Sequence, residues 1–192
     1  MQQAIFSAIA VALTFIAFVP YIRSILQDKT IPHVFSWIIW GSTTFVVFLA
    51  QLQDGGGIGA WPIGISGLIT LCIAVLAYLK KSDNAITKAD AVFFLSAMTS
   101  LPLWYLTADP LWAVIILTTV DTLGFGPTLR KGYQHPFEEQ LSFFALFVAR
   151  NLCVILALEH YSVTTVLFPA VIAAASLLLI LVIGYRRHVL SA

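Results

Sequence analysis

Two opposite charges, Asp121 and Arg150, lie deep inside long apolar stretches of this sequence. At roughly 1.5 Å of helix rise per residue, they lie about 16 Å and about 13 Å from the same end of their segments. An isolated charge in apolar surroundings costs several kcal/mol, so such groups usually pair with each other or face a polar cavity. We therefore expect Asp121 and Arg150 to meet directly or through a bound solute.

Three roles fit these two groups. They can form a structural salt bridge, Asp121 can exchange a proton during a transport cycle, or Arg150 can bind a substrate carboxylate or phosphate through its fork of donors. Asn151 follows Arg150 and adds an amide to the same segment. The apolar stretches hold no paired acids, no zinc-binding helix motif and no nucleophile beside a base, so we expect no catalytic residues, no metal and no enzyme.

The composition predicts an all-α integral membrane protein. Of the 192 residues, 60% are hydrophobic and 10% are charged, and the apolar runs reach the roughly 20 residues that a helix needs to cross a bilayer. The fourth run is interrupted by Pro102 and opens on Asp90. We predict seven membrane-spanning helices, at residues 3–26, 33–52, 60–79, 91–106, 111–130, 141–158 and 163–185.

The distribution of charge predicts the orientation of these helices. Nine of the ten Lys and Arg residues fall in alternate connections, whereas the other connections carry Asp54, Asp109 and Glu159. Because basic loops mark the cytoplasmic side, we expect a multi-pass protein of the bacterial inner (plasma) membrane, with its amino terminus outside and its carboxyl terminus in the cytoplasm. The net charge of +1 and the lack of a basic surface exclude nucleic acid as a partner.

The chain repeats itself at an offset of 107 residues, which relates Pro20 to Pro127 and Tyr78 to Tyr185. The offset predicts a first three-helix repeat at 1–81, a linker helix at 82–108 and a second three-helix repeat at 109–192. A unit of three helices followed by one linker keeps both repeats in the same orientation, so we expect them to be parallel. The offset also pairs Asp121 with Thr14, and Arg150 with Thr43.

Two sets of residues occur at the cytoplasmic ends of the predicted helices. Ser36 and Trp40 lie one helical turn apart and share a face of the second helix. Four prolines lie at the ends of the first, second, fifth and sixth helices: Pro20, Pro32, Pro127 and Pro136.

With these residues, the order of three helices, one helix and three helices resembles the PQ-loop (MtN3) superfamily, especially the SWEET sugar carriers. The resemblance covers nearly the whole chain. It implies that the four prolines are hinges for alternating access and that Ser36 and Trp40 line the substrate pocket. A proline removes one internal helix hydrogen bond and so favours bending, but Pro32 and Pro136 can also simply begin helices.

The chain departs from the family pattern at two pairs of positions. Tyr21 and Thr128 follow the prolines where the family has glutamine, and Ile63 and Ala170 replace the asparagines that would bind sugar hydroxyls. These substitutions argue against glucose-type transport and favour a substrate that uses other polar groups. We expect the binding site to contain Ser36, Trp40, Thr43, Thr44, Ser66, Asp121, Arg150 and Asn151.

The function that we expect is a carrier that moves a small polar organic solute by alternating access, sugar-like or otherwise, with proton linkage through Asp121 as one version. Two alternatives stay open: a vitamin or nucleoside carrier of the nicotinamide riboside type, and a ligand-binding receptor of related fold, such as the KDEL receptor. The expected partners are the small-molecule substrate and membrane lipid, and no motif implies a cofactor. Both halves lie in one chain, so the pocket is complete without a second subunit, although a homo-oligomer stays open.

Overall fold

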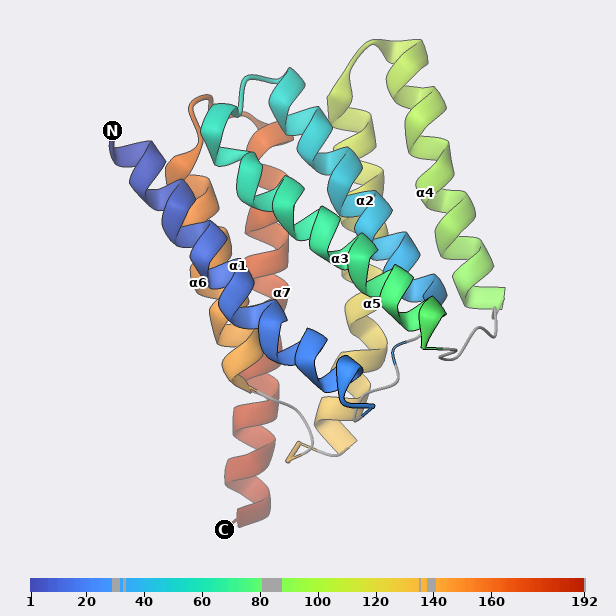
Figure 1. Cartoon of the computed structure of the whole chain (residues 1–192), viewed down its shortest axis with the longest axis vertical. Helices are drawn as coiled ribbons and strands as arrows, with labels where there is room; N and C mark the ends of the chain where they lie inside the picture. Colours follow the sequence, from blue (N-terminus) through green and yellow to red (C-terminus); the bar gives the residue numbers. More distant parts are fainter. Residues whose placement is uncertain (29–31, 33, 81–87, 135, 138–140, 192) are drawn as a thin grey trace.

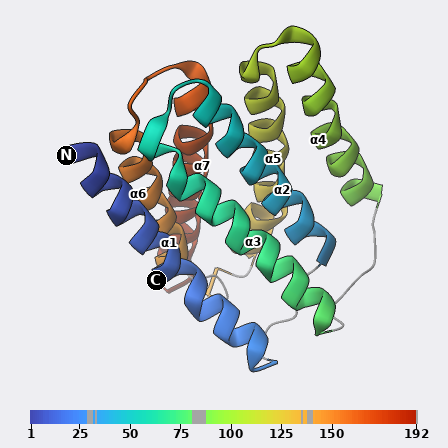
Figure 2. The ribbon, with the colours of Figure 1, turned by 45° about the horizontal axis from the view of Figure 1, so that its top comes forward.

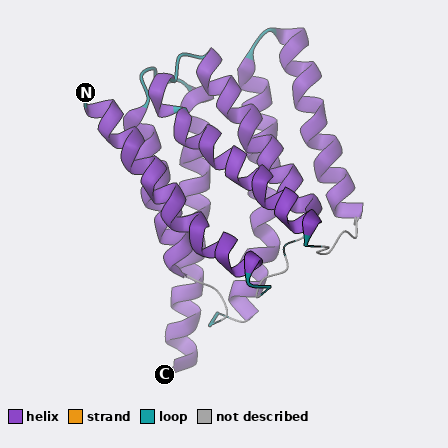
Figure 3. Cartoon of the chain, viewed as in Figure 1, coloured by secondary structure: helices purple, strands orange, loops and turns teal. Residues whose placement is uncertain are grey.

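The computed structural model describes residues 1–28, 32, 34–80, 88–134, 136–137 and 141–191 (Figure 1). Every regular element among these residues is a helix (Figure 3). The elements are α1 (Gln2–Leu26), α2 (Val34–Gln53), the short 3₁₀ turn η1 (Gly57–Gly59), α3 (Trp61–Leu79), α4 (Lys88–Thr107), α5 (Pro110–Gln134), α6 (Leu141–Ala157) and α7 (Val163–Ser191).

The expected helices are all present, and most of their ends differ from prediction by one residue. The largest differences are at α5, which continues to Gln134 instead of 130, and at α7, which continues to Ser191 instead of 185. An apolar run measures the depth of the hydrocarbon core. It does not mark where the backbone stops being helical, so polar residues extend both helices beyond the predicted spans.

Several helices are long and apolar enough to cross a membrane. In the part of the chain that the structure describes, four meet this condition: Gln2–Leu26, Val34–Gln53, Gly57–Leu79 and Val163–Leu190. Two shorter apolar helical stretches, Pro110–Gly126 and Leu141–Ala157, accompany them. This pattern is that of a multi-pass transmembrane helical protein. Helix α4, the span interrupted by Pro102, is not among these helices.

Successive helices run in opposite directions, so the bundle has two chemically different ends (Figures 1 and 2). The turns from α2 to α3, α4 to α5 and α6 to α7 lie together at one end, near the amino terminus. We call it the acidic end, because these turns carry Asp54, Asp109 and Glu159. The carboxyl terminus lies toward the other end, which we call the basic end, because it carries Lys80 and Arg187.

The helices pack as two groups of three, with α4 at the side. In the first group α3 packs against α1 and α2, and in the second group α7 packs against α5 and α6. The groups meet where α1 packs on α6 and α2 packs on α5, while α4 packs on α5 and α2 (Figure 2). Exchanging the two groups maps each of these neighbour pairs within and between the groups onto another.

Close approach within the first group depends on a small residue. At Gly41 of α2, an added Cβ would lie 2.7 Å from the Leu71 side chain of α3. Small residues commonly allow helices in membranes to pack this closely. A separate apolar core joins the two groups and includes Val47, Ile63, Val154 and Phe168.

Candidate functional site

A cavity of about 730 Å³ lies between the two groups of helices. Its lining begins at Ile16 in α1 and at Asp121 in α5, and it stops at Thr44 in α2 and at Arg150 in α6. These limits place most of the cavity in the half of the bundle toward the basic end, with both charges at its inner end. The volume is typical of a small-molecule site.

Asp121 is held by a hydroxyl from the opposite group. Its side chain is buried, and its Oδ1 atom accepts a hydrogen bond of 2.8 Å from the Thr43 hydroxyl. The same hydroxyl lies 3.0 Å from the Trp40 carbonyl oxygen. One hydroxyl has one proton to donate, so the carboxylate of Asp121 and the helix carbonyl compete for it.

Arg150 is fully enclosed by neutral partners in the described part of the chain. Its Nε donates to the Thr14 hydroxyl at 3.1 Å, and Nη2 donates to the Pro62 carbonyl at 3.2 Å. Nη1 lies 3.5 Å from the Asn151 Oδ1 atom, at the long limit of a hydrogen bond. The guanidinium carbon is 5.4 Å from the centre of the Phe147 ring, within the range of a cation–π contact.

The two charges do not form a direct salt bridge. Among the residues that the structure describes, ion pairs join Lys80 to Asp28 and His160 to Asp54, but none joins Asp121 to Arg150. Each charge instead bonds a hydroxyl of the facing helix in the other group. The direct pair is therefore absent, and a substrate-bridged pair is the arrangement that stays open.

The hydrogen bonds of Asp121 and Arg150 are related by the sequence repeat. Thr14 bonds Arg150, and Thr43 bonds Asp121. The offset of 107 residues turns the first pair of positions into the second. The same geometric contact is thus made on both sides of the boundary between the groups.

The other expected site residues divide between the cavity wall and the layer behind it. Trp40, Thr44 and Ser66 line the cavity. Asn151 is buried behind Arg150, where its Nδ2 donates to the Phe147 carbonyl at 2.8 Å. Ser36 is half-buried and lies outside the described lining.

The four prolines occupy two kinds of position. Pro20 lies inside α1 and lines the cavity, and Pro127 lies inside α5. Pro32 precedes α2, and Pro136 lies in a turn after α5. Only Pro20 and Pro127 therefore interrupt a helix ladder, and the hinge role of the set stays a prediction.

Sequence reasoning left out several groups that the structure brings to the site. Thr14 was identified only as the counterpart of Asp121, although the offset could have placed it opposite Arg150. The Pro62 carbonyl had no signal in the sequence. Ser176 of α7 lines the cavity, and its buried hydroxyl has no hydrogen-bond partner among the described residues.

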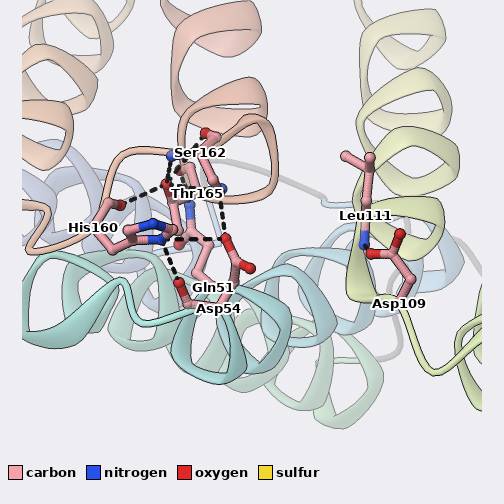
Figure 4. A network of polar contacts seen from close by, with 7 residues as sticks. All are labelled: Gln51, Asp54, Asp109, Leu111, His160, Ser162 and Thr165. Carbon is pink, nitrogen blue, oxygen red and sulfur yellow. Dashed lines mark hydrogen bonds and ion pairs between the residues drawn. The ribbon is translucent and has the colours of Figure 1, made fainter.

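The acidic end is closed by polar contacts between the two groups (Figure 4). We call Gln51, Asp54, His160, Ser162 and Thr165 the acidic-end network. The Ser162 hydroxyl donates to the Asp54 carboxylate, and the His160 Nδ1 atom lies 2.9 Å from the Asp54 carbonyl. The Gln51 Nε2 atom donates to the Thr165 carbonyl at 2.7 Å. Residues from the end of α2 thus bind residues at the start of α7.

Two further contacts close the same end. The backbone N–H of Ile58 donates to the Glu159 carboxylate at 3.2 Å, and the Gln3 amide donates to the Leu158 carbonyl at 3.2 Å. At Gly59, a Cβ would lie 2.5 Å from the Leu158 backbone nitrogen. The backbones of the two groups are therefore in close contact at the acidic end.

Comparison with known proteins adds no assignment: no family model, no curated protein and no solved structure matches this chain. The functional argument therefore depends on the geometry of the cavity and its two ends.

Proposed function

We propose that this protein is a carrier that moves a small organic solute across the membrane by alternating access. One observation carries the proposal: the cavity lies between two groups of helices, extends toward one end and is closed at the other by contacts between the groups. Rocking of the groups would break the acidic-end network and expose Asp121 and Arg150 to the opposite side.

Two parallel three-helix repeats, 1–81 and 109–192, joined by α4 as a linker and seventh span, would supply the moving parts. The exchangeable neighbour pairs of helices support this arrangement. The repeat-related contacts of Thr14 with Arg150 and of Thr43 with Asp121 support it independently, because they join side chains rather than helix axes.

The orientation proposed from the charge distribution makes this an inward-facing conformation. The basic end would face the cytoplasm and the acidic end the outside, so the cavity would extend toward the cytoplasm. The resemblance to the SWEET carriers favours the same cycle, and membrane lipid would cover the exposed apolar helix faces. A ligand-binding receptor is distinguished from this proposal by the absence of flux.

A cross-link through the acidic-end network tests the proposal. Asp54→Cys and Ser162→Cys replace two side chains that touch each other, in a background where Cys72 and Cys153 are changed to Ser and Ala. Oxidation should form a disulfide that keeps the acidic end closed. Uptake into proteoliposomes, measured with labelled amino acids, sugars, nucleosides and organic acids, should then stop and should recover on reduction.

Two controls separate locking from damage. The single variants should keep their flux after oxidation, because they cannot form the bridge. A pair within the first group, Asp28→Cys and Lys80→Cys, replaces an ion pair of 2.9 Å and should not block flux when oxidised. Undiminished transport by the cross-linked acidic-end pair would contradict alternating access. Flux measured at two pH values in Asp121→Asn tests the proton-linked version, in which the variant loses the pH dependence.

A further inference from the structure

The inner end of the cavity holds an acid and a base that do not neutralise each other. Of the charged side chains that the structure describes, only Asp121 and Arg150 line the cavity. Each is bound by neutral groups of the opposite helix group. A buried charge without an opposite partner is costly, so a ligand that carries both signs of charge would stabilise this site at two points.

The guanidinium of Arg150 has donors left for an anion. It carries five N–H groups, and the described contacts use one from each nitrogen, all toward neutral oxygens. A guanidinium fork binds the two oxygens of a carboxylate more strongly than it binds neutral acceptors. Arg150 is therefore suited to a carboxylate that enters through the cavity.

The walls of the cavity suit an apolar, flat molecular body. On one side, the Tyr21 ring lies 5.0 Å from the Trp37 ring, which lies 5.7 Å from the Trp40 ring. On the other side, the Phe143 and Phe147 rings are 4.6 Å apart. All five side chains line the cavity, and aromatic rings pack favourably against a further ring at such distances.

We propose that the cavity binds a small zwitterion with an aromatic body, with its carboxylate on Arg150, its ammonium group on Asp121 and its ring between the aromatic walls. A neutral polyol would leave both protein charges uncompensated. A simple anion would place a second negative charge near Asp121, and a simple cation would place a second positive charge near Arg150. This inference builds on the proposed carrier function and names the substrate class of the same site.

A matched set of ligands tests the inference on the unmodified protein. Phenylalanine has both charges, phenethylamine lacks the carboxylate, and 3-phenylpropionate lacks the ammonium group. Calorimetry in lipid nanodiscs should show that phenylalanine binds about 10- to 100-fold more tightly than either analogue, because each analogue loses one charge-assisted contact. Tryptophan, tryptamine and indole-3-propionate give the same comparison for a larger ring, and glucose tests the polyol.

Two variants assign the charges to the ligand groups. Arg150→Gln should abolish the preference for phenylalanine over phenethylamine and keep the preference over 3-phenylpropionate. Asp121→Asn should do the reverse. A purely structural role would lower all affinities together. Arg23→Gln, at an exposed arginine outside the described lining, is the matched control and should change neither preference.

The outcomes separate this inference from the carrier proposal. If glucose alone binds, or if the zwitterions bind no better than their analogues, the inference is wrong, and the carrier proposal then depends on the flux of another solute. If a zwitterion binds selectively but does not cross the membrane of proteoliposomes, the inference stands and the carrier proposal is wrong. Because the ligand set needs only the wild-type protein, unstable variants do not prevent the test.

Discussion

A single hydroxyl holds Asp121 in place, and its removal should destabilise the protein measurably. Thr43→Val keeps the shape of the side chain but removes the donor to the Asp121 carboxylate. Loss of a hydrogen bond to a charged group should lower the free energy of unfolding by about 1–3 kcal/mol. In an Asp121→Leu background the same substitution should cost much less, since its acceptor is gone. Reversible unfolding in mixed detergent micelles measures both values.

A neighbouring threonine supplies the control for this cycle. The Thr119 side chain is exposed and its hydroxyl bonds a carbonyl of its own helix at 2.8 Å, so Thr119→Val should change the free energy by no more than about 0.5 kcal/mol. Equal costs of Thr43→Val with and without Asp121 would show that the hydrogen bond contributes nothing.

The sequence located the two charges but not their partners. Depth along an apolar segment places Asp121 and Arg150 at similar heights, which follows from counting residues. Whether they touch depends on the rotation of each helix and on the distance across the bundle, and neither quantity is encoded locally. The repeat was the better guide, because it related Thr14 and Thr43 to the two charges before any contact was known.

A proline in α7 explains why Gln51 reaches across to the other group. Pro169 has no backbone N–H, so the Thr165 carbonyl, four residues earlier, lacks its usual helix donor. The buried Gln51 side chain supplies that donor at 2.7 Å. The break in one helix is thus satisfied by an amide from another, which couples α2 to α7 at the acidic end.

This coupling predicts a specific pattern of stability. Gln51→Leu should lower the free energy of unfolding by about 1–3 kcal/mol, because it leaves a buried carbonyl unsatisfied. In a Pro169→Ala background the loss should be smaller, since residue 169 then has an N–H that can bond the Thr165 carbonyl. The exposed Gln53 on the same helix is the control, and Gln53→Leu should be nearly neutral. A cost of Gln51→Leu that is unchanged by Pro169→Ala would contradict the proposed role of the proline.

Hydrophobic length predicted the helices well because membrane thickness imposes it. The beginning of α6 at Leu141 and the ends of α1 and α3, at Leu26 and Leu79, agree with the sequence pattern. The contacts of the acidic-end network could not be predicted in this way. They join turns that are more than 100 residues apart, and short polar turns carry no periodic signal.

The molecule as a whole is asymmetric between its two ends, although its helix packing is close to exchangeable. Backbone and side-chain contacts join the two groups at the acidic end, whereas the cavity separates them toward the basic end. A pair of repeats can adopt this state and its mirror state with similar packing, because the neighbour pairs that join the groups are equivalent. The difference between the ends is what a cycle of alternating access would reverse.

The asymmetry predicts which side of the membrane reaches the cavity. In a background without Cys72 and Cys153, a membrane-impermeant maleimide added to intact bacterial cells should label Asp109→Cys at the acidic end. It should label Lys80→Cys at the basic end only after the membrane is opened, because basic connections stay in the cytoplasm. Ser142→Cys, in the cavity lining, should follow Lys80→Cys when the carrier rests in the conformation described here. Labelling of Ser142→Cys from outside, with Asp109→Cys also labelled there, would place the cavity on the opposite side and overturn the inward-facing assignment. Labelling of Lys80→Cys instead of Asp109→Cys in intact cells would reverse the orientation of the whole bundle.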